Sequence, residues 1–183
     1  KQFFDSPEFQ GAVAPVTRLY FAYFNRIPDK PGLDYWLYSY RAGTSLNDIS
    51  QVFAGSPEFI GRYGSLNNTQ FVTLVYQNVL GRAPDPGGLA YWVARLDGGF
   101  VTRGQVMVGF SESAEYLLTS YHRVFVTMVY YGMLRRMPEQ AGFDYWVAVL
   151  DAGRVRLEGR LDPEDLVSPR LFPGATPHLV VAD

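Results

Sequence analysis

The sequence YQNVLGRAPDPGGLAYW at residues 76–92 occurs in two further versions, YFAYFNRIPDKPGLDYW at residues 20–36 and YYGMLRRMPEQAGFDYW at residues 130–146. Each version has a tyrosine, an arginine six residues later, a proline two after the arginine and a Tyr-Trp pair nine after it. We call this the Tyr-Arg-Trp block. The copies start 56 and then 54 residues apart, a period that indicates packed supersecondary units. Because chemistry is usually done by one unique constellation, three copies favour an architectural or binding role.

The recurring positions define a structural signature of four residues per copy. All three tryptophans of the 183-residue chain belong to it. The signature residues are Tyr20, Arg26, Asp29 and Trp36, then Tyr76, Arg82, Asp85 and Trp92, then Tyr130, Arg136, Glu139 and Trp146.

Each Tyr-Trp pair lies in a predicted amphipathic helix. Leu33, Trp36, Leu37 and Tyr40 follow the i, i+3, i+4, i+7 spacing of one helix face, and the other two copies repeat it. We expect these helices to end at left-handed C-terminal glycines, namely Gly43, Gly98 and Gly153. A longer apolar helix should precede each of them, over roughly residues 15–25, 69–80 and 121–134.

Two further helices are predicted in the first two copies. One follows the capping residues Ser45 and Thr102. The next starts at Ser56-Pro57-Glu58-Phe59 or Ser113-Ala114-Glu115-Tyr116, where serine and glutamate both satisfy free amides of a first turn. Ser6-Pro7-Glu8-Phe9 is the same Ser-x-Glu-aromatic motif ahead of the first copy.

These patterns predict an all-α protein, a tandem array of units of about three helices with no significant sheet. Residues 1–11 are interpreted as the tail of a preceding repeat or a remnant, and 12–64, 65–119 and 120–168 as repeats, the third partial. Residues 169–183 are expected to be an extended tail. Neighbouring units are expected to pack through their Tyr-Trp helices and to form a moderately elongated array.

Composition excludes several classes of function. The formal net charge of −2 and interleaved charges argue against nucleic-acid binding, which needs clustered basic residues. The absence of cysteine rules out disulfides and thiolate metal sites. The longest apolar run, residues 124–134, is too short to span a membrane.

No catalytic residue, metal site or cofactor is predicted. The two histidines, His122 and His178, have no partner pattern, and no serine sits in a nucleophile elbow. The aspartate-containing loops offer fewer oxygens than the six to eight that calcium takes, although a contribution of calcium stays open. Two interpretations are open for the pairs Arg26/Asp29, Arg82/Asp85 and Arg136/Glu139. In the favoured one, the arginine forms hydrogen bonds with the loop between two helices. In the other, the arginine and the acid bind a polar ligand.

Aromatic residues are the candidate binding groups. The tryptophans lie on core stripes and are expected to be buried. Tyr38, Tyr63, Tyr121 and Tyr131 fit the stripes less well, and exposed tyrosines can stack on sugars or anchor a protein partner.

Residues 71–85, followed by Gly88-Leu89-Ala90-Tyr91-Trp92 and Ser113-Ala114-Glu115-Tyr116, resemble a bacterial domain-of-unknown-function family numbered 4214. That family recurs in tandem in secreted, surface-layer and calcium-repeat proteins. The chain departs from its pattern at Glu139, at Arg135 and in the missing close of the third copy. A fainter similarity is to the phycobilisome linker domain.

The resemblance implies a helical module of an exported bacterial protein and offers no catalytic residues. We therefore expect a non-enzymatic interaction or scaffolding module, outside the cell or on its surface, that serves attachment or assembly. Its partner would be a protein or a surface glycan, with self-association open. Two alternatives remain, a carbohydrate-binding module that uses exposed tyrosines and a domain that positions a flanking enzyme or adhesin in a longer chain.

Overall fold

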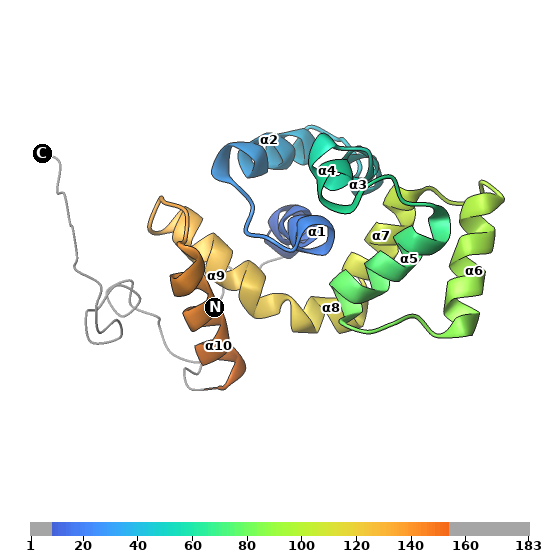
Figure 1. Cartoon of the computed structure of the whole chain (residues 1–183). Helices are drawn as coiled ribbons and strands as arrows, with labels where there is room; N and C mark the ends of the chain where they lie inside the picture. The colour runs from blue at the N-terminus through green and yellow to red at the C-terminus, as the bar shows by residue number, and fades with distance from the viewer. Residues whose placement is uncertain (1–8, 154–183) are drawn as a thin grey trace, which may run out of the picture.

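The computed structural model describes residues 9–153, which form helices joined by short loops, with no strand in this range (Figure 1). The elements, with η for a π-helix, are η1 (Phe9–Val13), α1 (Ala14–Phe24), α2 (Lys30–Arg41), α3 (Leu46–Ala54), α4 (Pro57–Tyr63), α5 (Asn68–Val75), η2 (Tyr76–Leu80), α6 (Pro86–Asp97), α7 (Arg103–Ser111), α8 (Ala114–Thr119), α9 (Tyr121–Gly132) and α10 (Gln140–Asp151). The all-α prediction is confirmed.

The helix starts follow the predicted capping signals. The Ser56 hydroxyl accepts a hydrogen bond from the Phe59 amide at 3.1 Å, and the Thr102 hydroxyl accepts one from Gln105 at 3.2 Å. Such caps satisfy amides that have no partner within the helix. One predicted helix end is wrong, because Gly98 keeps a right-handed backbone and Gly99 takes the left-handed conformation, with φ of 68°.

Helix α1 lies near the centre of the molecule, between α2 and α3 on one side and α9 on the other, whereas α6 lies at the edge (Figure 1). All eleven of its residues are buried. A helix that is apolar on all sides is expected inside a protein. The α1 sequence, APVTRLYFAYF, is apolar on nearly all sides, and Arg18 is its one charged residue. Helices α2, α3, α7 and α9 and the π-helix η2 all contact it.

The most extensive contact between helices joins α3 to α7, and Gly104 makes this close approach possible. A Cβ at Gly104 would lie 2.6 Å from the Gln51 amide nitrogen and 2.7 Å from the Asn47 carbonyl oxygen. The Ser50 hydroxyl crosses the contact and donates to the Gly104 carbonyl at 2.9 Å. The two backbones therefore touch where no side chain fits.

This arrangement corrects the expected packing of the units. The Tyr-Trp helices pack chiefly within their own copies, α6 on α5 and α10 on α9, although Phe143 of α10 also stacks on Phe21 of α1. The main contacts between copies run through α3, α7 and α1 instead. Because α9 of the third copy also reaches α1, the copies surround one helix and do not form an open stack.

The unit boundaries remain a prediction. Residues 1–8 and 154–183 lie outside the described residues, so the remnant at 1–11, the close of the third copy and the tail at 169–183 are largely or wholly beyond this description. In the part of the chain that the structure describes, none of the helices has the length and apolarity that a membrane span requires.

Candidate functional site

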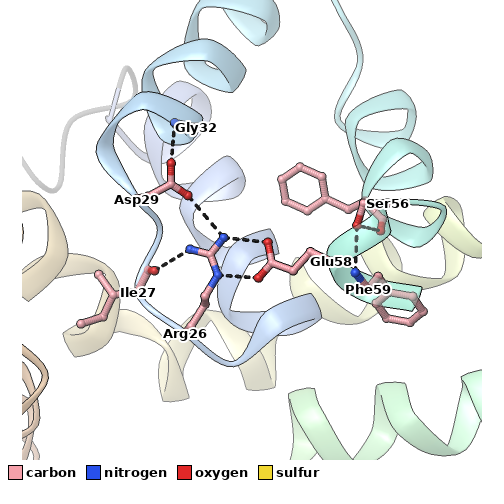
Figure 2. Close-up of polar contacts among 8 residues, drawn as sticks. Arg26, Ile27, Asp29, Gly32, Ser56, Glu58 and Phe59 are labelled. Atoms are coloured by element: carbon pink, nitrogen blue, oxygen red, sulfur yellow. Dashed lines mark hydrogen bonds and ion pairs between the residues drawn. The ribbon is translucent and has the colours of Figure 1, made fainter. Parts of the chain in front are cut away.

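The loop between α1 and α2 is held by the Arg26 guanidinium (Figure 2). Its Nε and Nη2 donate to the two carboxylate oxygens of Glu58 at 2.6 and 2.8 Å. Nη1 donates to the Ile27 carbonyl at 2.9 Å, and Nη2 also reaches Asp29 at 3.3 Å. All three guanidinium nitrogens are thus used within the chain, which supports the loop-bonding reading of this arginine.

Asp29 has a second role as the N-cap of α2. Its carboxylate accepts a hydrogen bond from the Gly32 amide at 2.8 Å, and Asp85 accepts one from Gly88 at 2.7 Å in the next copy. Glu139 caps nothing and bonds Arg136 at 2.5 Å. The extra methylene of glutamate accounts for this difference, because it moves the carboxylate away from the first-turn amides.

The acidic partner of the arginine differs between the copies. Arg82 lies 3.9 Å from Glu115, which occupies the position of Glu58, and Arg136 contacts Glu139 of its own loop. Each arginine nevertheless lies over the tyrosine that opens its block, with the guanidinium carbon 5.3, 5.6 and 5.1 Å from the rings of Tyr20, Tyr76 and Tyr130. The placement of the arginine is therefore common to the three copies.

The block tyrosines also fit against a glycine of the following helix. A Cβ at Gly32 would lie 2.6 Å from the Tyr20 hydroxyl, and one at Gly88 would lie 2.4 Å from the Tyr76 hydroxyl. In the third copy the corresponding distance from Gly142 to Tyr130 is 3.0 Å. A side chain at this glycine would displace the tyrosine, which explains the pairing of these two residue types.

These contacts and the burial of the tyrosines shift the pKa values of several side chains at the loops. The hydrogen bonds from Arg26 lower the pKa of Glu58, against a smaller opposing effect of burial. Burial is the largest cause that raises the pKa of Tyr20, Tyr76 and Tyr130, so these phenols stay neutral.

In the first two copies the tryptophans pack against the third helix of the unit, α3 or α7. The Trp36 and Tyr20 rings both contact Phe53, at 5.4 and 5.0 Å between centroids. Trp92 and Tyr76 contact Phe110 in the same way, at 5.6 and 4.9 Å. Burial differs from the expectation, however, because Trp146 is buried while Trp36 and Trp92 are half-buried.

The tyrosine of each Tyr-Trp pair faces solvent. Tyr35, Tyr91 and Tyr145 are 62%, 54% and 37% exposed. Each ring meets the neighbouring tryptophan edge to face, at 4.9, 5.1 and 5.3 Å. These three tyrosines are not among the predicted binding residues, although the i, i+3, i+4 pattern places them off the buried stripe.

The four tyrosines predicted as candidate binding residues do not form one site. Tyr38 is exposed, whereas Tyr63 and Tyr121 are half-buried. The expectation of exposure is wrong for Tyr131, which is buried and donates a hydrogen bond to the Pro28 carbonyl. Burial raises its pKa to about 12. Tyr63 accepts a hydrogen bond from Asn78 at 3.2 Å.

A cavity of about 430 Å³ lies between the α1–α2 loop and α10. Its lining includes Arg26, Arg123, Asp144 and Asp151, so it carries charges of both signs, and none of the four candidate tyrosines lines it. Arg123 lies 4.3 Å from the centre of the Phe21 ring, and burial lowers its pKa. The signs of these charges alone do not select one class of ligand.

Metal-binding groups are not brought together in the described range. Residues 9–153 contain no group of three or more histidine, cysteine, aspartate and glutamate side chains that could hold an ion. His122 bonds Asp151 at 2.6 Å instead.

Glu58 and Glu115 contact the arginines, although their sequence positions predict only first-turn acids of a helix. The signal that could have found them is their recurrence at nearly the same distance after Arg26 and Arg82.

Comparison with known proteins gives one family and nothing else, since no curated protein and no solved structure matches the chain. The matched stretch contains the second Tyr-Arg-Trp block and its Ser-x-Glu-aromatic motif, the residues on which the resemblance was based. Residues 50–120 match the model of the family described as "Domain of unknown function (DUF4214)", the family that this stretch of the sequence resembles.

Proposed function

We propose that this protein is a non-enzymatic interaction and scaffolding module of a secreted or cell-surface bacterial protein, and that it serves surface attachment or assembly. The observation that carries the proposal is the outward position of Tyr35, Tyr91 and Tyr145, one in each copy of the block. The location outside the cell rests on the family resemblance alone.

The other recurring residues are used to hold the fold. Arg26 bonds its loop, Tyr20 fits against a glycine, and Trp36 packs on Phe53. The outward tyrosines differ from these residues in exposure, and removing the ring of Tyr35 or Tyr91 would empty no core position. An exposed aromatic residue that recurs in every copy is a candidate for binding.

Tyrosine suits contact with a partner because it joins a large apolar ring to a polar hydroxyl and has few rotatable bonds. The edge-to-face contact with the adjacent tryptophan also restrains the ring, which reduces the entropy lost on binding. Helices α2, α6 and α10 lie on different sides of the molecule (Figure 1). The three tyrosines therefore form separate contact points, which suits a scaffold that engages several partners or several sites of one partner.

Binding to envelope preparations of the producing bacterium tests the proposal. The triple variant Tyr35→Ser, Tyr91→Ser and Tyr145→Ser should lose most of the bound fraction while its circular dichroism stays that of the parent. The matched control replaces Val52, Phe100 and Leu118 by serine, because these side chains are also exposed but do not recur with the block. Equal loss in both variants would show that general surface apolarity, and not the tyrosines, drives binding.

Carbohydrate binding is the second candidate, and α2 favours it. Tyr35 and Tyr38 are 62% and 74% exposed and lie three residues apart, so they are neighbours on one helix face. Two adjacent rings can stack on a sugar. A glycan array separates the candidates, because Tyr38→Ala should abolish glycan signals of this origin whereas Tyr91→Ala on α6 should leave them unchanged.

A further inference from the structure

The cavity between the α1–α2 loop and α10 lies where the first copy meets the third. Arg123 of α9 and Asp144 of α10 both line it. Its volume of about 430 Å³ is within the range of sites that hold small molecules. Charges of both signs line the cavity, so the ligand that it fits depends on which of these charged groups already have partners.

Two of the four charged side chains that line the cavity have their partners within the chain. The Arg26 guanidinium donates from all three of its nitrogens to its own loop and to α4. The Asp151 carboxylate lies 2.6 Å from Nδ1 of His122. Arg123 and Asp144 remain, and their charges are equal and opposite.

The Arg123 guanidinium is a half-buried cation that has no ion pair with the described residues. Its Nη2 donates to the side-chain oxygen of Asn25 at 3.1 Å, while Nε and Nη1 donate to none of the described residues. The guanidinium carbon lies 4.3 Å from the centre of the buried Phe21 ring, which restrains its position. A cation that is partly withdrawn from water usually has an anionic partner, so this one is suited to the carboxylate of a ligand.

Asp144 supplies the opposite charge in the same cavity. Its Oδ1 accepts a hydrogen bond from Gln140 at 2.8 Å, and its Oδ2 accepts none from the described residues. Burial lowers the pKa of Arg123, and the negative charge of Asp144 opposes this effect, although no ion pair joins the two side chains within residues 9–153. The two groups are therefore open to a ligand that accepts hydrogen bonds from the guanidinium and donates to the carboxylate.

Part of the cavity wall is apolar, with Ile27, Phe143 and Val147 in the lining. An α-amino acid matches this combination, because its carboxylate and its ammonium group share one carbon atom and its side chain leaves that atom in a third direction. A ligand with an anionic group alone would meet the carboxylates of α10. A ligand with a cationic group alone would meet the unpaired guanidinium.

We propose that this cavity binds a free α-amino acid with an apolar side chain. Its carboxylate pairs with Arg123, its ammonium group pairs with Asp144, and its side chain lies against Ile27 and Val147. The bound amino acid joins α10 of the third copy to the α1–α2 loop of the first, so binding stabilises this contact between the copies. The inference goes beyond the scaffold function and does not rest on the exposed tyrosines.

Leucine and two of its analogues test the charges of the ligand. Calorimetric titration of the parent chain with leucine should give a dissociation constant below about 1 mM. 4-Methylpentanoate lacks the ammonium group of leucine, and isopentylamine lacks the carboxylate. Each should bind at least about tenfold more weakly, because it leaves one charge of the cavity unpaired. The protein is the same in all three titrations, so differences in folding do not enter.

Isoleucine methyl signals locate the bound leucine. The chain contains three isoleucines, Ile27, Ile49 and Ile60, and of these only Ile27 lines the cavity. In NMR spectra of isoleucine-labelled protein, leucine should shift the methyl signal of Ile27 and leave the other two in place.

Two variants test the residues. Asp144→Asn and Arg123→Gln should each weaken leucine binding at least about tenfold. Asp34→Asn is the matched control, because Asp34 has the position of Asp144 in the first block and does not line the cavity. The Asp144 side chain is exposed, so Asp144→Asn should keep the circular dichroism of the parent and decides the matter if Arg123→Gln loses structure.

Three results would overturn the proposal. The first is the absence of leucine binding in calorimetry. The second is 4-methylpentanoate or glucose binding as tightly as leucine, which would make the cavity a site for anions or for sugars. The third is leucine binding that Asp144→Asn leaves unchanged or that shifts Ile49 or Ile60 in place of Ile27. Envelope binding by the tyrosine variants is a separate measurement, so the two proposals fail separately.

Discussion

Arg18 of α1 and Glu112 at the end of α7 form a bidentate ion pair, with Nε and Nη2 2.9 and 2.5 Å from the two carboxylate oxygens. The Arg18 side chain is 5% exposed and that of Glu112 is 27% exposed. The pair joins the central helix of the first copy to the third helix of the second.

Removing the acid should therefore cost more than removing the base. Glu112→Ala leaves a buried guanidinium without its partner, so the free energy of unfolding should fall by about 3–5 kcal/mol. Arg18→Met should cost less, because it keeps the packing volume and the freed carboxylate can be hydrated. Urea unfolding of both variants measures the difference, and a larger loss in Arg18→Met would contradict the asymmetry.

Two glycines of α7 should respond to alanine in opposite ways. Gly104→Ala would place a methyl group against the backbone of α3 and should destabilise the protein by about 1–3 kcal/mol, the usual cost of overpacking. Gly109 has nothing within 4 Å of its would-be Cβ, so Gly109→Ala should stabilise by about 0.5–1 kcal/mol through helix propensity. Thermal unfolding compares the melting temperatures of the two variants. Equal shifts in melting temperature would mean that α3 and α7 do not approach each other this closely.

Glu58 should stabilise the protein only above acidic pH. Its pKa is lower in the folded chain than the ordinary value of 4.5, because the carboxylate accepts hydrogen bonds from Arg26. The stabilisation is complete above that ordinary value and is lost as the pH falls through the lowered folded-state pKa. Since the Glu58 side chain is 42% exposed, this stabilisation should be below about 1 kcal/mol.

The difference between the parent and Glu58→Gln, measured by urea unfolding at a series of pH values, shows this effect. The difference should be largest near neutral pH and should shrink below the ordinary glutamate pKa. Glu115→Gln serves as the control, because its carboxylate lies 3.9 Å from Arg82 and should show a smaller change. A difference that grows on acidification would reverse the sign argued here.

Glu139→Asp should stabilise the third copy. The shorter side chain can accept the first-turn amide of α10 as Asp29 and Asp85 do for α2 and α6. A restored N-cap contributes about 0.5–1 kcal/mol. A higher melting temperature with unchanged helix content would agree, whereas a loss of stability would show that the bond to Arg136 matters more than the cap.

The tryptophans should differ in their contribution to stability. Trp146 is 3% exposed, so Trp146→Ala should cost about 3–5 kcal/mol. Trp92→Ala should cost roughly 2 kcal/mol, because α6 contains no buried residue and the ring is half-buried there. Equal losses in the two variants would mean that α6 is covered in solution.

Local signals made the helices predictable. Capping residues such as Ser56 and Thr102 act within three residues, and the Leu33/Trp36/Leu37 spacing acts within two turns, so both can be read from the sequence. The loop role of Arg26 also followed from neighbouring residues. Its strongest partner, Glu58, lies 32 residues further on and becomes visible only when the helices are packed.

The arrangement of the copies could not be predicted in the same way. Equal blocks suggest equal surroundings, yet Trp146 is buried and Trp92 is not. The difference arises because α10 reaches the central helix, where Phe143 stacks on Phe21 at 5.9 Å, while α6 stays at the edge. Gly104 likewise reads as an ordinary helix residue until the backbone of α3 is placed against it.

The full burial of α1 has a consequence for how the chain folds as it is synthesised. This helix leaves the ribosome before two of its neighbours, α7 and α9, which are made about eighty residues or more afterwards. At typical synthesis rates its apolar surface then lacks those neighbours for several seconds. The first copy can complete its core only after the third copy has emerged. The nascent protein is therefore exposed to chaperones and carries a risk of misassembly during synthesis.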